Sequence, residues 1–453
     1  MTPPLHCAAS IPTNTVSMKN KNIQPRKGCQ VGLACLILAL CGRSMAAETM
    51  EQAWANALQV DHGLAAAGQR EEAARHGLAA AEARRLPTVN LNAGYTRLQS
   101  EPAAAINIPA LHLNGLPFAQ DESYSAGVSF SAPLFTAGRI SNGIAAAGAM
   151  TDAARAASQL GRNELKLAVA EAYVGVLRAQ RLNAVAVSHV KSIERHAADV
   201  GQLFKQGYAA RHDLLAAQVA LADARQQALQ GANAVALAGA AYNRLLGRAQ
   251  DQSVDLAELG DAAPAGADLA TLIAAGRGQR SELGQLTAQE TALRRQSASV
   301  AAQRAPQVGL SGGWGKLQNR YLVEDKGWWI GVALKWDLFD GGLVKREAAQ
   351  LGANAQAVAE LRAEASDKIE LQVRQSWLRL QEAAARIEVA RAALAQADET
   401  LDLSRERYRA GLAPNSEVLD AETRRMGAYA NRDNAFYDRA LAQLRLQYAS
   451  GRL

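Results

Sequence analysis

The stretch from Ser123 to Gly138, SYSAGVSFSAPLFTAG, decides the fold. Its even positions from Tyr124 to Leu134 are almost all apolar and alternate with serines, which is the period of a β-strand with one apolar and one polar face. After Gly138 the chain is rich in Ala, Leu, Gln and Arg and contains no proline before Pro264, a composition typical of long helices. The stretch therefore predicts a strand that leads directly into a long helix.

Three further segments show the same alternation, and they are Thr88 to Leu98, Val308 to Leu317 and Trp328 to Phe339. Strands of about ten residues with one apolar face are typical of a transmembrane β-barrel. Three tryptophans near the strand ends suit an aromatic girdle at the membrane interface: Trp328, Trp329 and Trp336. The strands alone leave a soluble β-sandwich open as the alternative.

The chain repeats itself at an offset of 204 residues. Leu134 to Gly138 matches Leu338 to Gly342, and Phe204 to Gly207 matches Tyr408 to Gly411. The strands that precede these segments match at an offset of 219, so the first hairpin loop, Gln99 to Glu122, is 15 residues longer than its counterpart. Each half is expected to run strand, loop, strand, long helix, glycine-containing turn and helix.

The helices are long enough to extend far from the strands. The segment Ile140 to Gln206 would measure about 100 Å as a helix, and its partner His212 to Leu246 about half of that. Two further segments of helical pattern, Met50 to Arg84 and Asp268 to Arg304, are expected to complete the layer. Apolar residues at heptad spacing indicate coiled-coil packing: Leu394, Leu401 and Tyr408.

Four strands cannot close a barrel, and lipid does not tolerate an open sheet edge. Two chains would give eight strands, whose interior side chains fill, and three would give twelve, which leaves room for a pore. A homotrimer is the better inference. The predicted fold class is a mixture of an all-α coiled-coil barrel and a transmembrane β-barrel, with four strands and long helices per chain in two internal repeats, closed as a twelve-stranded trimer.

The N-terminal part of the 453 residues has the features of a secretory signal peptide. It starts at Met18, has an apolar region from Val31 to Leu40, and ends in a cleavage site at Ser44-Met45-Ala46. Lipidation of Cys41 is the alternative use of this region. All four cysteines lie within the first 41 residues, so the rest of the chain can form no disulfide.

The formal net charge of +6 also belongs to the leader. Five of the 49 basic residues precede residue 47, where there is no Asp or Glu, so the remainder carries a net charge of only +1. A nucleic-acid partner is not expected. The histidines lack metal-ligand or triad spacing, and the Gly-rich segment Gly309 to Gly315 lacks the Lys-Ser/Thr of a phosphate loop. No enzyme activity and no cofactor are predicted.

These patterns divide the chain into seven segments. They are residues 1–46, a signal peptide with an upstream extension; 47–85, a periplasmic helix; 86–135, the first β-hairpin of the membrane barrel; 136–250, a long helix, tip turn and return helix; 251–304, a linker and periplasmic helix; 305–340, the second β-hairpin; and 341–453, the second long helix, tip turn and return helix.

The two glycine-containing turns, Phe204 to Leu215 and Tyr408 to Asp420, complete a pattern that resembles the TolC-like outer membrane efflux protein family, also called outer membrane factors. The resemblance covers essentially the whole exported chain. It implies a homotrimer that forms a barrel in the outer membrane lipid of a Gram-negative bacterium and a helical barrel across the periplasm. It also implies a periplasmic adaptor and an inner-membrane pump as partners, in a tripartite efflux or type I secretion system.

The same resemblance implies two sets of site residues. The periplasmic gate would contain Asp213, Tyr408, Glu417 and Asp420, and the adaptor-docking tips would contain Gly207, Tyr208, Gly411 and Leu412. A gate position that the family often fills with Arg is Ala413 here, so Arg211 and Arg409 become candidate partners of Asp213.

Simpler interpretations of these residues stay open. Glycine is common where a helix ends with positive φ, and Asp213 and Glu417 fit the first turn of a helix. Glu417 and Asp420 share a helix face, which would form an acidic ring in a threefold pore if that face is the lumen. A trimeric, surface-anchored coiled-coil adhesin is the alternative function, and the cargo, whether drug, metal ion, siderophore or protein, is left open.

Overall fold

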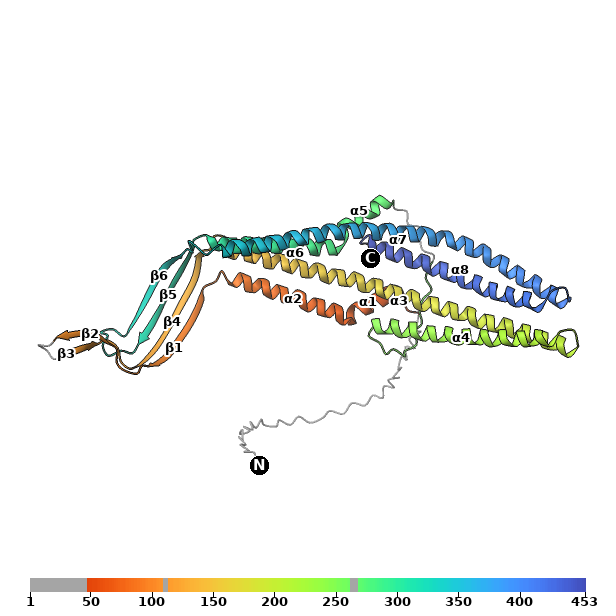
Figure 1. Ribbon diagram of the computed structural model, residues 1–453, viewed down its shortest axis with the longest axis horizontal. Coiled ribbons are helices and arrows are strands. Elements are labelled where there is room, and N and C mark those ends of the chain that lie inside the picture. Colours follow the sequence, from red (N-terminus) through yellow and green to blue (C-terminus); the bar gives the residue numbers. More distant parts are fainter. Residues whose placement is uncertain (1–46, 109–112, 261–267) are drawn as a thin grey trace, which may run out of the picture. The chain divides into compact units, whose positions relative to one another are not determined.

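The computed structural model describes residues 47–108, 113–260 and 268–453. The expected signal peptide and Cys41 lie outside these residues. Residues 47–453 form one compact unit. Figure 1 shows its strands gathered at one end of a set of long helices.

The main sheet has four antiparallel strands in the order β1-β4-β5-β6. Their bounds are β1 Thr88–Arg97, β4 Glu122–Phe135, β5 Gln307–Leu317 and β6 Lys326–Lys335. The four predicted strand segments correspond to these strands. The last one ends four residues earlier than expected, because the chain leaves the sheet at Trp336, whose indole donates to the Arg304 carbonyl at 3.0 Å. Phe339 is consequently 92% exposed.

A second, two-stranded sheet occupies the long first hairpin loop. It pairs β2 (Ala103–Ile108) with β3 (Leu113–Pro117) and was not expected from the sequence. The first of these strands begins with three alanines, which give no alternation between polar and apolar residues, and the pairing is irregular between Ala104 and Asn107. The longer first hairpin loop therefore contains an additional two-stranded sheet.

The long helices confirm the internal repeat. The helices α3 (Arg139–Lys205) and α7 (Leu343–Arg409) each have 67 residues, and α4 (Arg211–Leu245) and α8 (Asn415–Ala449) each have 35. Both pairs are related by the offset of 204 residues. Each long helix begins after a glycine in the left-handed conformation, with φ of 89° at Gly138 and 85° at Gly342.

The segments 50–84 and 268–304 each fold as two helices, not as the single helices expected. The first gives α1 (Met50–Val60) and α2 (His62–Ala83), and the second gives α5 (Leu269–Gln279) and α6 (Ser281–Ala301), followed by the short 3-10 helix η2 (Ala302–Arg304). The breaks lie at Asp61 and Arg280, which both adopt extended backbone. At Asp61 the carboxylate accepts from the Leu64 amide at 2.7 Å and so starts a new helix.

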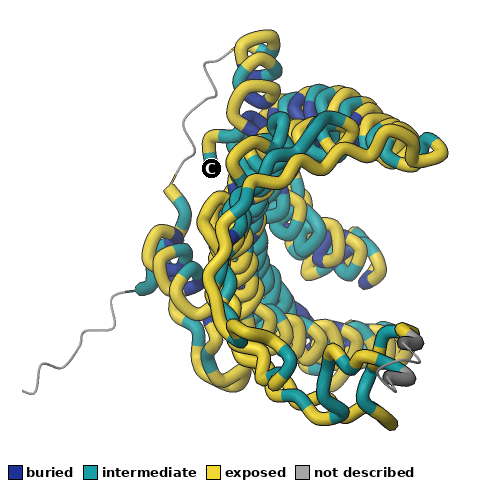
Figure 2. The backbone as a smooth tube through the Cα atoms, turned by 90° about the vertical axis from the view of Figure 1, so that its left-hand side faces the viewer, coloured by how far each residue is buried: buried dark blue, intermediate teal, exposed yellow. Residues whose placement is uncertain are grey.

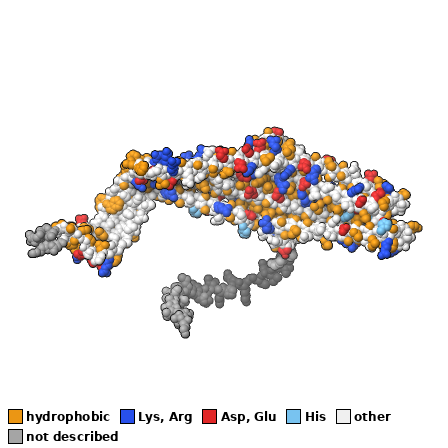
Figure 3. All heavy atoms as spheres, viewed as in Figure 1, with side chains coloured by type: hydrophobic (Ala, Val, Ile, Leu, Met, Phe, Trp, Pro, Cys, Tyr) orange, Lys and Arg blue, Asp and Glu red, His pale blue; other side chains and the backbone are white. Residues whose placement is uncertain are grey.

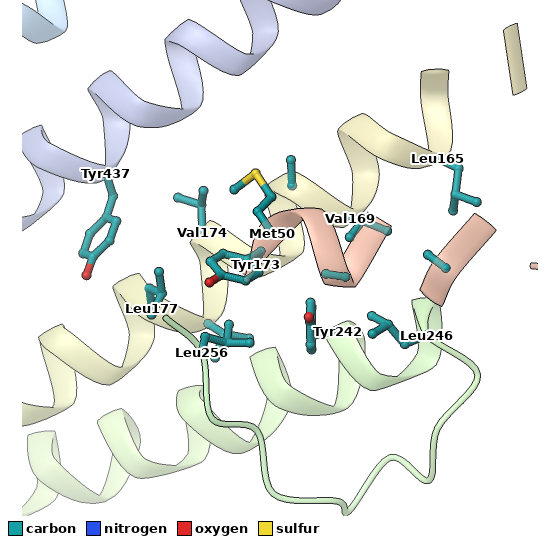
Figure 4. Packing of buried hydrophobic residues seen from close by; sticks show 14 residues of the cluster. Met50, Leu165, Val169, Tyr173, Val174, Leu177, Tyr242, Leu246, Leu256 and Tyr437 are labelled. Carbon is teal, nitrogen blue, oxygen red and sulfur yellow. The ribbon is translucent and has the colours of Figure 1, made fainter. Parts of the chain in front are cut away.

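Two apolar clusters near the middle of the helices form most of the core. The first surrounds Tyr173 and Tyr242, which make an edge contact with their centroids 6.1 Å apart (Figure 4). The second joins α5, α7 and α8 and contains Val373 and Leu446, which are the repeat partners of Val169 and Tyr242. Buried positions are a minority, and most of the backbone is intermediate or exposed (Figure 2). None of the helices described has the length and apolar character needed to cross a membrane.

Candidate functional site

The two helix tips have the same backbone geometry. After α3 the amide of Tyr208 donates to the Leu203 carbonyl at 2.8 Å, and after α7 the amide of Leu412 donates to the Arg407 carbonyl at 2.8 Å. This is the Schellman arrangement, which needs a left-handed residue just past the helix end. Gly207 and Gly411 supply it with φ of 81° and 72°.

The residues that follow the two glycines project from the tips. Tyr208 is 82% exposed and Leu412 is 71% exposed. A Cβ added to either Gly207 or Gly411 would meet no atom within 4 Å, so only the positive φ requires glycine there. The four predicted docking residues thus lie together in pairs on two exposed turns.

The predicted gate acids begin the return helices. Asp213 and Glu417 are each the third residue of α4 and α8, a position where a negative charge is favoured by the helix dipole. Glu417 lies 3.5 Å from the Arg407 guanidinium. Asp420 is exposed and forms no ion pair in the described part of the chain.

Neither candidate arginine contacts Asp213. The nearest basic group is the imidazole of His212, 3.3 Å from the carboxylate, whereas Arg409 pairs with Asp199 on α3 at 2.9 Å. Arg211 is exposed and makes no ion pair with any residue that the structure describes. The Arg409–Asp199 pair instead links the two long helices next to the tips.

Tyr408 lies between two small apolar clusters, one around Val200 and one around Val418. Its ring makes an edge contact with His196, with centroids 5.6 Å apart. Burial, and secondarily the nearby charge of Asp213, raise the pKa of the Tyr408 hydroxyl. No described residue forms a hydrogen bond with this buried hydroxyl, so Tyr408 and Asp213 are not hydrogen-bonded in the isolated chain.

A buried polar chain joins the two helical hairpins at this level. The His196 Nε2 atom on α3 lies 2.7 Å from the Asn415 Oδ1 atom on α8, and the Asn415 Nδ2 atom donates to the Asp213 carbonyl at 3.1 Å. A carbonyl oxygen can only accept, which fixes the orientation of the Asn415 amide. The His196 Nε2 atom must therefore carry a proton and donate it.

A second buried polar group lies further from the tips. The Glu422 carboxylate, 1% exposed, pairs with Arg405 on α7 and accepts from the Ser192 hydroxyl on α3 at 3.0 Å. The His189 imidazole is 3.9 Å from the other carboxylate oxygen. A buried ion pair costs desolvation, so its partners must stay together for the helices to pack.

We call these two groups the polar seam, defined as His189, Ser192, His196, Arg405, Asn415 and Glu422. The seam connects the α3–α4 hairpin with the α7–α8 hairpin, because α3 and α8 are the helices that pack across the junction. The sequence interpretation did not identify the seam. Its only signal is a heptad spacing shared by two polar pairs, since His189 and His196 are seven residues apart, as are Asn415 and Glu422.

We predict that acid weakens the seam. Burial lowers the pKa of both His189 and His196 below the ordinary value of 6.5. At His189 the charge of Arg425 lowers the pKa further, and Glu422 opposes the shift. At His196 the charge of Arg405 lowers the pKa further, and Asn415, Glu422 and Asp199 oppose the shift. An opened seam binds protons near pH 6.5 that the closed seam does not bind. The stabilisation that the closed seam contributes is therefore complete above pH 6.5 and is lost as the pH falls below that value.

Amide hydrogen exchange of the purified protein at pH 7.5 and 5.5, corrected for the intrinsic effect of pH on exchange, tests this prediction. Protection of α3 and α8 around the seam should fall at pH 5.5 in the native chain, and His196→Gln, which keeps a donor for Asn415, should reduce that response. An acid response of equal size in His196→Gln would show that His196 is not the group that titrates.

The main sheet has two chemically different faces. Paired residues across all four strands place apolar side chains on one face, as in the row Leu91, Val128, Trp314 and Trp328. The neighbouring row on the opposite face is Asn92, Gly127, Gly315 and Gly327. The apolar residues of the first face are exposed in the single chain, as expected for a surface that contacts lipid.

Both sides of the chain end in unpartnered surfaces. The strands β1 and β6 are the edges of the sheet, and each pairs on one side only. Among the helices, α4 packs on α3, while α7 packs on α6 and α8. The large apolar residues left exposed on these two helices are Leu215, Val219, Leu229 and Leu237 on α4 and Leu343, Leu361, Leu371, Leu378, Val389 and Leu403 on α7. No group of three or more His, Cys, Asp or Glu side chains within the described ranges is arranged to hold a metal ion.

Comparisons with known proteins agree with this geometry. The family model described as outer membrane efflux protein matches residues 54–248 and 272–452. No curated protein sequence matches the chain.

Solved structures share the fold at low sequence identity. The outer membrane protein VceC of Vibrio cholerae has a TM-score of 0.76 and 20% identity, with 89% of this chain and 96% of VceC covered. A membrane protein from Pseudomonas aeruginosa has a TM-score of 0.77 and 21% identity, covering 89% and 93%. The CmeC outer membrane channel of Campylobacter jejuni has a TM-score of 0.76 and 16% identity, covering 89% and 85%.

A sheet with one lipid-compatible face, joined to long paired helices in two repeats, defines an outer membrane channel subunit. The chain belongs to the outer membrane efflux protein family, because the family model covers most of its length. The predicted fold class is confirmed in its four main strands, its long helices and its two internal repeats.

Proposed function

We propose that three copies of this chain form the exit duct of a tripartite efflux or type I secretion system. The observation that carries the proposal is the open, two-faced sheet. Each chain supplies four strands whose edges, β1 and β6, have unpaired backbone groups that lipid would not satisfy. Pairing β6 of one chain with β1 of the next closes a twelve-stranded barrel.

The polar face of the closed sheet would line the pore. Small residues along it, such as Asn92, Gly127 and Gly315, leave the interior open. The same closure would place the exposed apolar residues of α7 beside those of α4 in the next chain and bury them. Strands and helices therefore support the same lateral contact, and the duct would act without enzymatic chemistry.

We propose that the tips close the periplasmic end and dock a periplasmic adaptor coupled to an inner-membrane pump. Tyr208 and Leu412 are exposed apolar residues on rigid turns, which suits contacts with a helical partner. The gate would combine Asp213, Tyr408, Glu417 and Asp420 with the polar seam. Asp420 is the acid best placed to act on passing ions, because Glu417 is close to Arg407.

The chain would reach the outer membrane of a Gram-negative bacterium through the signal peptide in residues 18–46, with cleavage after Ala46. Lipidation of Cys41 is the alternative processing. A surface-anchored adhesin is less favoured, because β-hairpins interrupt the helical chain twice and the strands are not gathered at one terminus.

Replacing the tip glycines tests the docking proposal. Gly207→Val or Gly411→Val should abolish export while the trimer still assembles, because a β-branched residue resists the positive φ by more than about 1 kcal/mol and would displace Tyr208 or Leu412. Export is measured in cells that carry the matching adaptor and pump. Gly427→Val in α8, where an added Cβ also meets no atom, is the control. Export at the native level in both tip variants would place adaptor docking elsewhere.

A further inference from the structure

Every junction between a strand of the main sheet and a helix carries a basic residue. Arg84 and Arg85 precede β1, Arg139 begins α3 after β4, Arg304 precedes β5, and Lys345 and Arg346 lie in the first turn of α7 after β6. Figure 3 shows basic side chains gathered where the strands meet the helices. Because basic residues occur at all four junctions, they mark one level of the molecule, where the main sheet meets the helices.

Five of these residues are exposed and form no ion pair within the described ranges. Arg304 lies beside the central strand β5, and the other four flank the edge strands β1 and β6: Arg84, Arg85, Lys345 and Arg346. We call these four residues the basic collar. The acidic residues near the collar either interact with other groups or form no ion pair with the four cations. Both oxygens of Asp340 accept from backbone amides, and Asp337 lies 3.6 Å from Lys335. Glu82 and Glu347 are exposed and pair with none of the four.

The opposite end of the sheet differs. There Arg97 pairs with Glu122 at 3.3 Å, Lys316 pairs with Asp325 at 3.5 Å, and Arg320 pairs with Glu101. At that end three of the four basic residues described are paired and Lys326 is not, whereas at the end next to the helices only Lys335 is paired with an acid. The asymmetry indicates an external anion on the helix side.

The collar borders the apolar face of the sheet directly. Exposed apolar residues lie between one and eleven positions from the cations along the chain: Leu86, Leu334, Trp336, Leu338, Phe339 and Leu343. Long basic side chains next to such a belt can extend from the hydrocarbon region to the phosphate level of a bilayer. The depth of the collar therefore matches that of lipid headgroups.

We propose that the basic collar binds the phosphates of anionic phospholipids in the membrane leaflet that faces the helices. The proposal rests on the barrel closure given above, since closure brings Arg84 and Arg85 of one chain beside Lys345 and Arg346 of the next. Like charges that meet without an acid between them repel each other. Phospholipid phosphates at each of the three subunit boundaries remove that repulsion, and each cation near an anionic surface adds to binding.

Quenching of tryptophan fluorescence by brominated lipids tests this proposal on the full-length, detergent-purified protein. Four of the six tryptophans lie in or beside the sheet: Trp314, Trp328, Trp329 and Trp336. The native chain should bind brominated phosphatidylglycerol at least about threefold more tightly than brominated phosphatidylcholine. Arg84→Gln, Arg85→Gln, Lys345→Gln and Arg346→Gln combined should bring the ratio close to one, and either pair of substitutions alone should remove part of it.

The control removes the same charge from exposed cations of the helical part, with Arg70→Gln, Arg162→Gln, Lys191→Gln and Arg379→Gln combined. It should keep the native ratio. The proposal is overturned if the native chain binds the two lipids equally tightly. It is also overturned if the control variant loses the preference for phosphatidylglycerol as fully as the collar variant does. The oligomer size is measured on the same samples, and the lipid preference can be measured whether or not a trimer forms. A missing lipid preference can therefore be distinguished from a missing trimer.

Discussion

Leu91→Lys is expected to prevent insertion of the assembled protein into the membrane, whereas Asn92→Lys is expected to be tolerated. Leu91 is 77% exposed on the apolar face near the middle of β1, and Asn92 faces the opposite side. A lysine on the lipid side of a barrel costs about 2–4 kcal/mol at the bilayer centre. The proposed trimer would contain three copies, so the total cost would approach the full stability of an ordinary domain.

The measurement is the fraction of each variant that is recovered as trimer from outer membranes. Leu91→Lys should be nearly absent from that fraction. Asn92→Lys should be recovered and should shift ion selectivity toward anions, because the new charge would line the proposed pore. Equal recovery of the two variants would contradict the assignment of lipid and pore faces.

Glu422→Leu is expected to open the polar seam. The substitution leaves the Arg405 guanidinium and the Ser192 hydroxyl without their buried acceptor. Removing one partner of a buried ion pair costs about 3–5 kcal/mol, and the lower figure applies because the Arg405 side chain is 24% exposed. Amide exchange in residues 415–426 should then become faster by roughly two orders of magnitude.

Two controls distinguish the seam from a general loss of stability. The double variant Glu422→Leu/Arg405→Leu removes both charges and should restore most of the protection. Glu388→Leu breaks the exposed pair with Arg391 and should change exchange only a few-fold, since surface pairs contribute about 0–1 kcal/mol. Normal protection in Glu422→Leu would mean that the seam does not hold the two hairpins together.

The main strands and long helices could be predicted from sequence because their signals are local. Period-two alternation marks the strands, and the helices that follow begin at glycines such as Gly138 and Gly342. Duplication strengthened these signals, since each pattern occurs twice. The breaks at Asp61 and Arg280 were missed because a single capping residue does not interrupt a helical composition.

The polar seam could not be predicted in the same way. His196 and Asn415 are 219 residues apart in sequence, and Ser192 and Glu422 are 230 apart. Their contact depends on how α3 packs against α8, which periodicity does not specify. The gate residues Asp213 and Tyr408 were proposed from resemblance, and the structure places them beside the seam but does not join them to each other by a hydrogen bond.

Cysteine cross-linking between the sheet edges tests the trimeric duct most directly. The chain has no cysteine after Cys41, so introduced pairs have no native competitor in the rest of the protein. Val89→Cys in β1 would be combined in turn with Ile330→Cys, Val332→Cys or Leu334→Cys in β6, which share the apolar face. At least one combination, oxidised in outer membranes, should give a ladder of covalent products that ends at three chains. A ladder that extends beyond three chains, or only monomers in every combination, would contradict the closed trimer.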